Sequence, residues 1–111
     1  MIREINILDA KDIQEICKDE LGYNVDIKTV KTQIEKLSID YEHHTIAVYE
    51  DKKTSKVVGF VHAEMYESLY SDIGLNILGL AVNSNFQGMG IGKKLMVFVE
   101  EYALNNNINF I

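Results

Sequence analysis

The stretch that decides the fold is residues 77–95, which read ILGLAVNSNFQGMGIGKKL. Its opening part, residues 77–82, is almost wholly apolar, as expected of a strand that is buried on both faces. A turn-like segment follows at 83–86, and three glycines then fall within five residues. Apolar residues recur at helical spacing beyond the glycines. The stretch therefore predicts a strand, a glycine-rich loop and a helix in immediate succession.

A glycine-rich loop ahead of a helix often holds phosphate, because converging backbone N–H groups and the positive helix end attract anions. A nucleotide-hydrolysing P-loop needs four residues between its first glycine and a Gly-Lys pair, followed by Ser or Thr. Here Gly88 and Gly92 enclose three residues, and Lys94 stands where the hydroxyl should be. A dinucleotide fingerprint needs the spacing G-x-G-x-x-G and a later acidic residue. The spacing G-x-G-x-G, so late in the chain, excludes that motif as well.

The remaining pattern is Q-x-x-G-x-G, formed by Gln87, Gly90 and Gly92 directly after the apolar strand. It resembles the pyrophosphate loop of the GNAT acetyltransferase superfamily, and the likeness is specific from Ile77 to Leu95. The resemblance implies a single α/β domain over residues 1–111, with a mixed sheet, flanking helices and the GNAT-like acyl-CoA acyltransferase fold. Family members usually continue further, so it also implies a C-terminally short chain, truncated after the fifth strand. Taken alone, the loop could also be a glycine turn that merely introduces a structural helix.

By this resemblance the ligand is acetyl-CoA, bound as a cosubstrate. The apolar strand is expected to be bulged near Ala81 and Val82, so that freed backbone groups bind the pantetheine arm. A freed N–H near Leu80 or Val82 would polarise the thioester carbonyl. Backbone amides of the glycine loop would hold the pyrophosphate. The residues that the resemblance assigns to cofactor binding are Leu80, Ala81, Val82, Gln87, Gly88, Met89, Gly90, Ile91, Gly92 and Lys93.

The implied reaction is transfer of an acetyl group to the primary amine of a small molecule or peptide. Proximity supplies much of such catalysis, and a base must take the amine proton. Many relatives carry a glutamate just before the apolar strand, where this chain has Asn76. Glu64 and Glu67, near the end of the preceding strand, are the nearest acidic substitutes; the alternative is that both are solvated surface carboxylates. Ser84 stands where many members have proline.

Hydrophobic periodicity predicts the remaining elements. Asp9 is expected to cap the first helix and Gly22 to stop it in a left-handed conformation. His43 and His44 point to opposite sides of an extended chain, so they are a poor chelating pair and no metal site is expected. The expected elements are a strand at 2–8, helices at 10–21 and 27–37, strands at 45–50 and 57–65, a polar connection at 66–76, a helix between 91 and 105, and a strand from 108.

Composition limits the location and the partners. Seventeen acidic and eleven basic residues give a net charge of −6, a field that repels nucleic acid and mildly favours cations. No apolar run approaches the ~18–20 residues of a membrane helix. The N-terminus lacks the apolar core of a signal peptide, and the single Cys17 cannot form an internal disulfide. No membrane association is therefore expected, and the cytoplasm is the expected location.

The predicted C-terminal strand, at residues 108–111, would leave an unpaired edge that favours a homodimer or a larger assembly. Two readings of function therefore stay open. The main one is an acetyl-CoA-dependent N-acetyltransferase. The alternative is an acyl-CoA-binding remnant or oligomeric interaction domain with little catalytic turnover.

Overall fold

The computed structural model describes residues 1–109 and 111. Its strands are β1 (Ile2–Glu4), β2 (His44–Glu50), β3 (Val57–Ser68) and β4 (Ser71–Val82). Its α-helices are α1 (Ala10–Leu21), α2 (Ile27–Ser38) and α3 (Ile91–Asn105), and two short 3-10 turns are η1 (Ile7–Asp9) and η2 (Ser84–Phe86). The strands form one antiparallel sheet of four in the order β1-β2-β3-β4.

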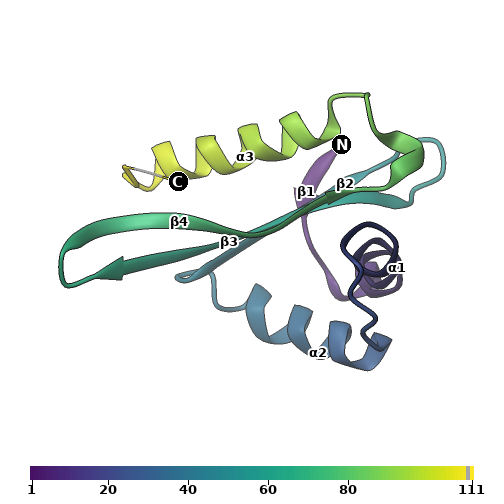
Figure 1. Ribbon diagram of the computed structural model, residues 1–111, viewed down its shortest axis with the longest axis horizontal. Coiled ribbons are helices and arrows are strands. Elements are labelled where there is room, and N and C mark those ends of the chain that lie inside the picture. Colours follow the sequence, from purple (N-terminus) through teal and green to yellow (C-terminus); the bar gives the residue numbers. More distant parts are fainter. Residues whose placement is uncertain (110) are drawn as a thin grey trace.

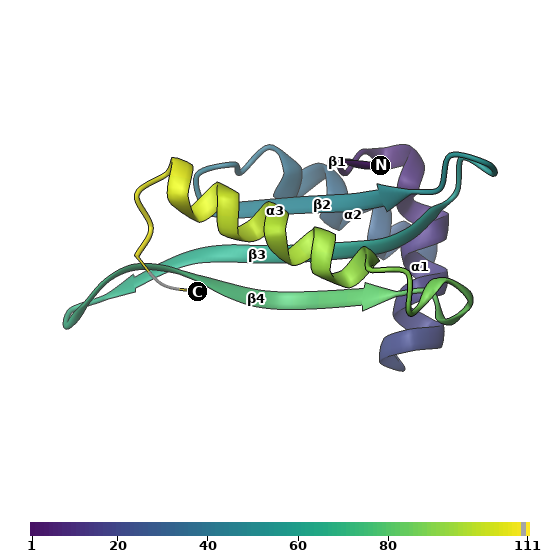
Figure 2. The ribbon, with the colours of Figure 1, turned by 90° about the horizontal axis from the view of Figure 1, so that it is seen from above.

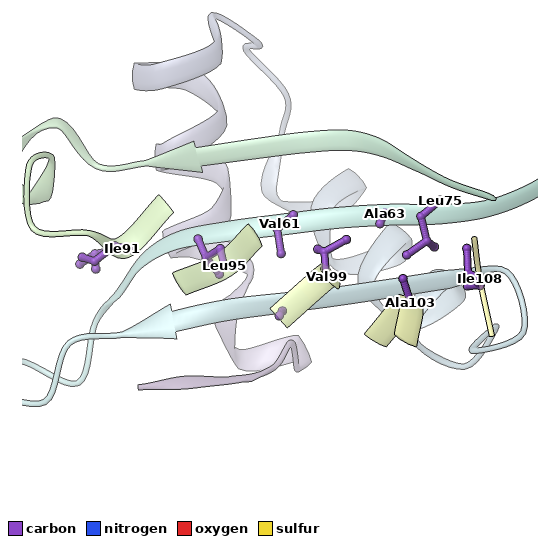
Figure 3. Packing of buried hydrophobic residues seen from close by; sticks show 10 residues of the cluster. Val61, Ala63, Leu75, Ile91, Leu95, Val99, Ala103 and Ile108 are labelled. Carbon is purple, nitrogen blue, oxygen red and sulfur yellow. The ribbon is translucent and has the colours of Figure 1, made fainter. Parts of the chain in front are cut away.

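The sheet is the middle layer of three, with α3 on one face and α1 and α2 on the other (Figure 1). On the first face, α3 lies across the long strands and packs Leu95 and Val99 onto Val61 (Figures 2 and 3). On the other face, α1 and α2 bury Ile13, Ile16, Val30 and Ile34 against Val48 and Phe60. Burial of each such side chain contributes about 1.5–3 kcal/mol, so both amphipathic helix faces are held by the sheet. The predicted α/β domain with flanking helices is confirmed.

The start of α1 differs from the prediction. Asp9 occupies the N-cap position of α1 but makes no side-chain capping bond there. Its carboxylate instead accepts from the backbone N–H of Asn6 at 2.9 Å and from both terminal nitrogens of Arg3 at 2.9 and 2.8 Å. Asn6 caps η1 by accepting from the N–H of Leu8. The ion pair with Arg3 forms in place of the predicted helix cap because Asp9 is only 4% exposed, and a buried carboxylate needs a counter-charge.

The segment at 66–76, predicted as a polar connection, is a long hairpin. β3 continues to Ser68 and β4 begins at Ser71, so the strands are joined by a tight turn. Polar residues alternate here with apolar ones, and Leu75 is fully buried against α3. That alternation is the pattern of a strand with one solvated face, so this segment extends both strands. The hairpin end extends beyond the helices (Figure 1).

β4 also departs from the expected burial and bulge. Leu78 is 48% exposed and Leu80 is 37% exposed, so the strand is not buried on both faces. The cause is its place at the end of the strand order, with β3 as its neighbour among the described residues. The register breaks between the pairs His62–Gly79 and Ala63–Ile77, which leaves Leu78 as the extra residue. The bulge predicted near Ala81 and Val82 therefore lies at Leu78.

The strand predicted from Ile108 does not form at the residues that the structure describes. Asn107 adopts a positive φ of 56°, and the N–H of Ile108 donates to the carbonyl of Ala103 at 2.8 Å. These contacts turn the chain back onto α3, where the side chain of Ile108 joins the core (Figure 3). Ile108, Asn109 and Ile111 have no strand pairing, and residue 110 lies outside the described residues. The described sheet is accordingly antiparallel throughout.

Candidate functional site

The glycine loop places a row of backbone amides at the start of α3. Gly88 and Gly90 have φ values of 81° and 79°, in the left-handed region that favours glycine. No side chain caps α3, and the N–H of Lys94 makes the first bond of the helix, to the carbonyl of Gly90. The amides just before Lys94 therefore have no acceptor within the helix. Amides in this arrangement, at the positive end of a helix, form a site for an anion.

The neighbouring end of β4 presents backbone groups at the open edge of the sheet. The N–H of Asn83 donates to the carbonyl of Val58 at 2.7 Å, so these residues form a hydrogen-bonded pair. Hydrogen-bonded and non-hydrogen-bonded pairs alternate along an antiparallel ladder. The register is regular here, so Leu80 and Val82 are non-hydrogen-bonded positions whose N–H and C=O groups point away from β3. The carbonyl of Val82 accepts from the side-chain amide of Gln87 at 3.2 Å.

These two features open into one groove of about 460 Å³. Every residue assigned to cofactor binding from the sequence lines it, except Met89 and Lys93, whose side chains are exposed to solvent. The donor set fits a diphosphate at the helix start and an extended amide chain along β4. The lining residues are Glu20, Leu21, Leu80, Ala81, Val82, Phe86, Gln87, Gly88, Gly90, Ile91 and Gly92.

Glu20 is a member of this groove that sequence reasoning missed. Its carboxylate accepts from the backbone N–H of Ser84 at 3.0 Å and so connects α1 to the loop after β4. A proline at position 84 would have no N–H to donate. The N–H of Ser84 thus makes a specific contact, and that contact places a negative charge beside the anion site. No local sequence signal indicates a contact between residues so far apart.

We expect the substitution Glu20→Gln to strengthen acetyl-CoA binding about threefold, or ~0.6 kcal/mol, which is the scale of one exposed charge interaction. Glutamine retains the oxygen that accepts from Ser84 but removes the charge that repels a diphosphate. Isothermal titration calorimetry with acetyl-CoA measures the change. Glu15→Gln is the control, because Glu15 also lies on α1 but pairs with Lys56 and does not line the groove. Unchanged or weaker binding by Glu20→Gln would show that its charge does not face the ligand.

The two carboxylates predicted as base candidates occupy different places. Glu64 pairs with Asn76 across the sheet, and its carboxylate accepts from the Asn76 side chain at 3.4 Å. Glu67 lies in the exposed end of β3, next to the hairpin turn. At about 3.3 Å per residue along a strand, Glu64 is ~10 Å and Glu67 ~20 Å from the level of Leu80. The structure therefore brings Glu64, and not Glu67, next to Asn76.

The histidines also form a pair that the sequence reasoning missed. The Nδ1 of His43 donates to the carboxylate of Asp40 at 2.8 Å, and this hydrogen bond raises the pKa of His43. His44 instead meets His62 across the sheet, with Nδ1 and Nε2 2.9 Å apart. The strand register determines this contact, so knowledge of the pairing would have revealed it. Within residues 1–109 and 111, no group of three or more His, Cys, Asp or Glu side chains could hold a metal ion.

Known structures share this fold. The chain is similar to glucosamine-6-phosphate N-acetyltransferase from Arabidopsis thaliana, with a TM-score of 0.86 and 20% identity over 99% of this chain and 78% of that one. A GNAT family acetyltransferase from Staphylococcus aureus gives a TM-score of 0.82 and 22% identity over 100% of this chain and 82% of that one. A transcriptional regulator from Bacillus halodurans gives a TM-score of 0.85 and 18% identity, over 100% of this chain and 78% of that one. These likenesses confirm the predicted acyltransferase fold.

Sequence comparison identifies the family. No curated protein sequence matches the chain significantly. In the part of the chain that the structure describes, no helix has the length and apolar character needed to cross a membrane. The model of the Acetyltransferase (GNAT) family matches residues 10–111, which include the glycine loop and β4. The chain therefore belongs to the GNAT acetyltransferase family.

Proposed function

We propose that this protein transfers an acetyl group from acetyl-CoA to the primary amine of a small molecule or peptide. The observation that carries the proposal is the meeting of two backbone features in one groove. The amides before Lys94 face the space at the start of α3, and the outward-facing groups of Leu80 and Val82 continue from it along β4. Together they match the two chemically different parts of coenzyme A, a diphosphate and an amide-containing arm.

The proposed reaction is direct transfer. Acetyl-CoA supplies an electrophilic thioester carbonyl, and the protein holds the amine against it, which makes the attack effectively intramolecular. The N–H of Leu80 would donate to the carbonyl oxygen and stabilise the charge that develops there. Of the two carboxylates predicted from the sequence, Glu64 lies nearer to Leu80 and is therefore the better candidate for the base. Glu67 is not retained in this role because of its distance along β3.

The proposal places the protein in the cytoplasm, acting on a soluble amine without nucleic-acid or membrane partners. It also includes a homodimer or larger assembly through the exposed C-terminal edge, where the side chain of Ile111 is 48% exposed. Ile108, predicted to be part of that edge, is buried in the core and cannot contribute. Light scattering at near-physiological salt tests the assembly, and a monomer would contradict this part of the proposal.

Thiol release from acetyl-CoA tests the activity. With a panel of primary amines, we expect release above the hydrolysis background for at least one member, and acetylated amine as the product. Binding of acetyl-CoA without release for any amine would instead support the acyl-CoA-binding remnant, which Asn76 at the usual glutamate position favours.

A further inference from the structure

A pair of histidines lies beside the proposed acetyl site, and the acetyl transfer described above gives neither of them a role. His44 of β2 and His62 of β3 have their ring centroids 5.1 Å apart and their Nδ1 and Nε2 atoms 2.9 Å apart. In two neutral rings at this distance, one nitrogen donates and the other accepts. Strand alternation places both rings, with Phe60, on the sheet face that α1 and α2 cover. A proton that arrives at one ring can therefore pass to the other.

His62 lines a second groove, of about 290 Å³, between that sheet face and the two helices. The lining is mostly apolar and includes no Asp, Glu, Lys or Arg. Its titratable members are Cys17 of α1, Tyr23 of the connection after α1, and His62 itself. The groove reaches Leu78 and Gly79 of β4, so it ends at the strand that holds the acetyl group in the proposed function.

The register sets how near His62 is to that strand position. His62 pairs with Gly79, the residue next to Leu80, and paired Cα atoms in a sheet are about 5.5 Å apart. Glu64, on the same face of β3, pairs with Asn76. It lies two residues farther along β3 than His62 and is therefore farther from Leu80. His62 is thus the titratable side chain of β3 nearest to the proposed oxyanion donor on this face.

We propose that His62, supported by His44, takes the proton of an acceptor amine whose single apolar group lies in the groove between α1, α2 and the sheet. This inference rests on the proposed function. The amine lone pair forms the C–N bond at the thioester carbonyl carbon, and one N–H proton passes to the imidazole of His62. The C–S bond then breaks, and the coenzyme A thiolate leaves and takes up a proton from the imidazolium.

The surroundings of His62 suit this role. Burial in the groove, followed by the charge of His44, lowers the pKa of His62, while Glu64 acts in the opposite direction. A lowered pKa keeps the ring neutral near pH 7, and the neutral ring is the form that accepts a proton. Besides these groups, α1 presents Cys17 and the following connection presents Tyr23, whereas α2 presents only uncharged residues to the groove.

The lining of the groove indicates the class of acceptor. A polyamine or an aminoglycoside would lose hydration at its additional charges and find no carboxylate in exchange. An aryl or alkyl group would instead displace water from apolar walls, which is favourable. The volume of about 290 Å³ lies at the lower end of the ~300–1,000 Å³ of small-molecule pockets, which suits a small arylalkylamine.

The experiment compares His62→Gln, His44→Gln and Glu64→Gln with the control His43→Gln, whose histidine is exposed and bonded to Asp40. Acetyl-CoA affinity is measured by calorimetry, and thiol release is measured with 2-phenylethylamine and with spermidine across the pH range of histidine titration. We expect His62→Gln to lower the rate about 10²-fold or more, with acetyl-CoA affinity unchanged. His44→Gln should move the acidic limb of the pH profile to higher pH, because burial still lowers the pKa of His62 but the contribution of His44 is removed. His43→Gln should change neither property.

A second readout does not need turnover. In the histidine side-chain NMR spectrum of the wild-type protein, 2-phenylethylamine should shift the signals of His62 and spermidine should not. A wild-type rate and pH profile in His62→Gln would overturn the inference, as would loss of the rate in Glu64→Gln alone. His62 signals that do not shift when 2-phenylethylamine is added would also overturn it. Each of these results leaves the proposed function standing if acetyl-CoA still binds. Failure of the wild-type protein to bind acetyl-CoA would remove the proposed function and this inference together.

Discussion

Replacing Gly92 by aspartate is expected to weaken acetyl-CoA binding about 100-fold, or ~3 kcal/mol, while the domain becomes no less stable. Gly92 lies in the first turn of α3, and an added Cβ would have only Val82 Cγ2 nearby, at an ordinary contact distance of 3.8 Å. A carboxylate at a helix N-terminus stabilises the helix by about 0.3–1 kcal/mol. The same charge would repel a diphosphate that binds the adjacent amides. Calorimetry with acetyl-CoA and urea unfolding measure the two effects.

Gly92→Asn is the matched control, because asparagine has nearly the same shape as aspartate but no charge. We expect it to weaken binding by less than about tenfold, since only the added bulk acts. Gly90 is a poorer test, because its φ of 79° makes any side chain there strained regardless of the ligand. If aspartate weakens binding no more than asparagine does, the anion does not lie at the start of α3.

Replacing Arg3 by methionine is expected to lower the free energy of unfolding by about 2–4 kcal/mol. The guanidinium of Arg3 donates to both carboxylate oxygens of Asp9 and, through Nε, to Glu50 at 3.0 Å. It thereby connects β1 to the start of α1 and to the end of β2. Without Arg3, the carboxylate of Asp9 stays buried with no counter-charge, and this loss outweighs the modest value of the pair itself. Urea denaturation measures the change.

Two further variants separate this explanation from a general loss of contacts. Lys56→Met removes an exposed ion pair with Glu15 and should cost less than about 1 kcal/mol. Arg3→Met combined with Asp9→Asn should recover part of the loss, because the unpaired charge is then gone. A double variant that is as unstable as the sum of its parts would show that Asp9 does not depend on Arg3.

The strand, loop and helix at residues 77–95 could be predicted because their signals are local. Glycines at 88 and 90 adopt the left-handed backbone that their identity allows, and the apolar spacing after them determines the face of α3. The groove residues that β4 and the glycine loop contribute follow from that geometry. A motif whose function depends on backbone amides can be located without knowledge of side-chain contacts.

The rest of the site depends on contacts between residues that are distant in sequence, and hydrophobic periodicity does not reveal such contacts. The contact of Glu20 with Ser84 joins residues on α1 and on the loop after β4. His44 and His62 meet because β2 and β3 pair in one register, and a shift of one residue would separate them. Arg3 competes for Asp9 with the expected helix cap, and that competition is decided by burial. Tertiary packing decides all three.

The most direct test of the central claim is a calorimetric comparison of acetyl-CoA, free coenzyme A and ATP at matched ionic strength. All three ligands carry adenosine and phosphates, but only the first two carry the arm that the edge of β4 would bind. The predicted result is binding of acetyl-CoA and coenzyme A at least about tenfold tighter than binding of ATP, a difference of ~1.4 kcal/mol. Equal affinity for ATP would contradict the assignment of the groove to an acyl-CoA.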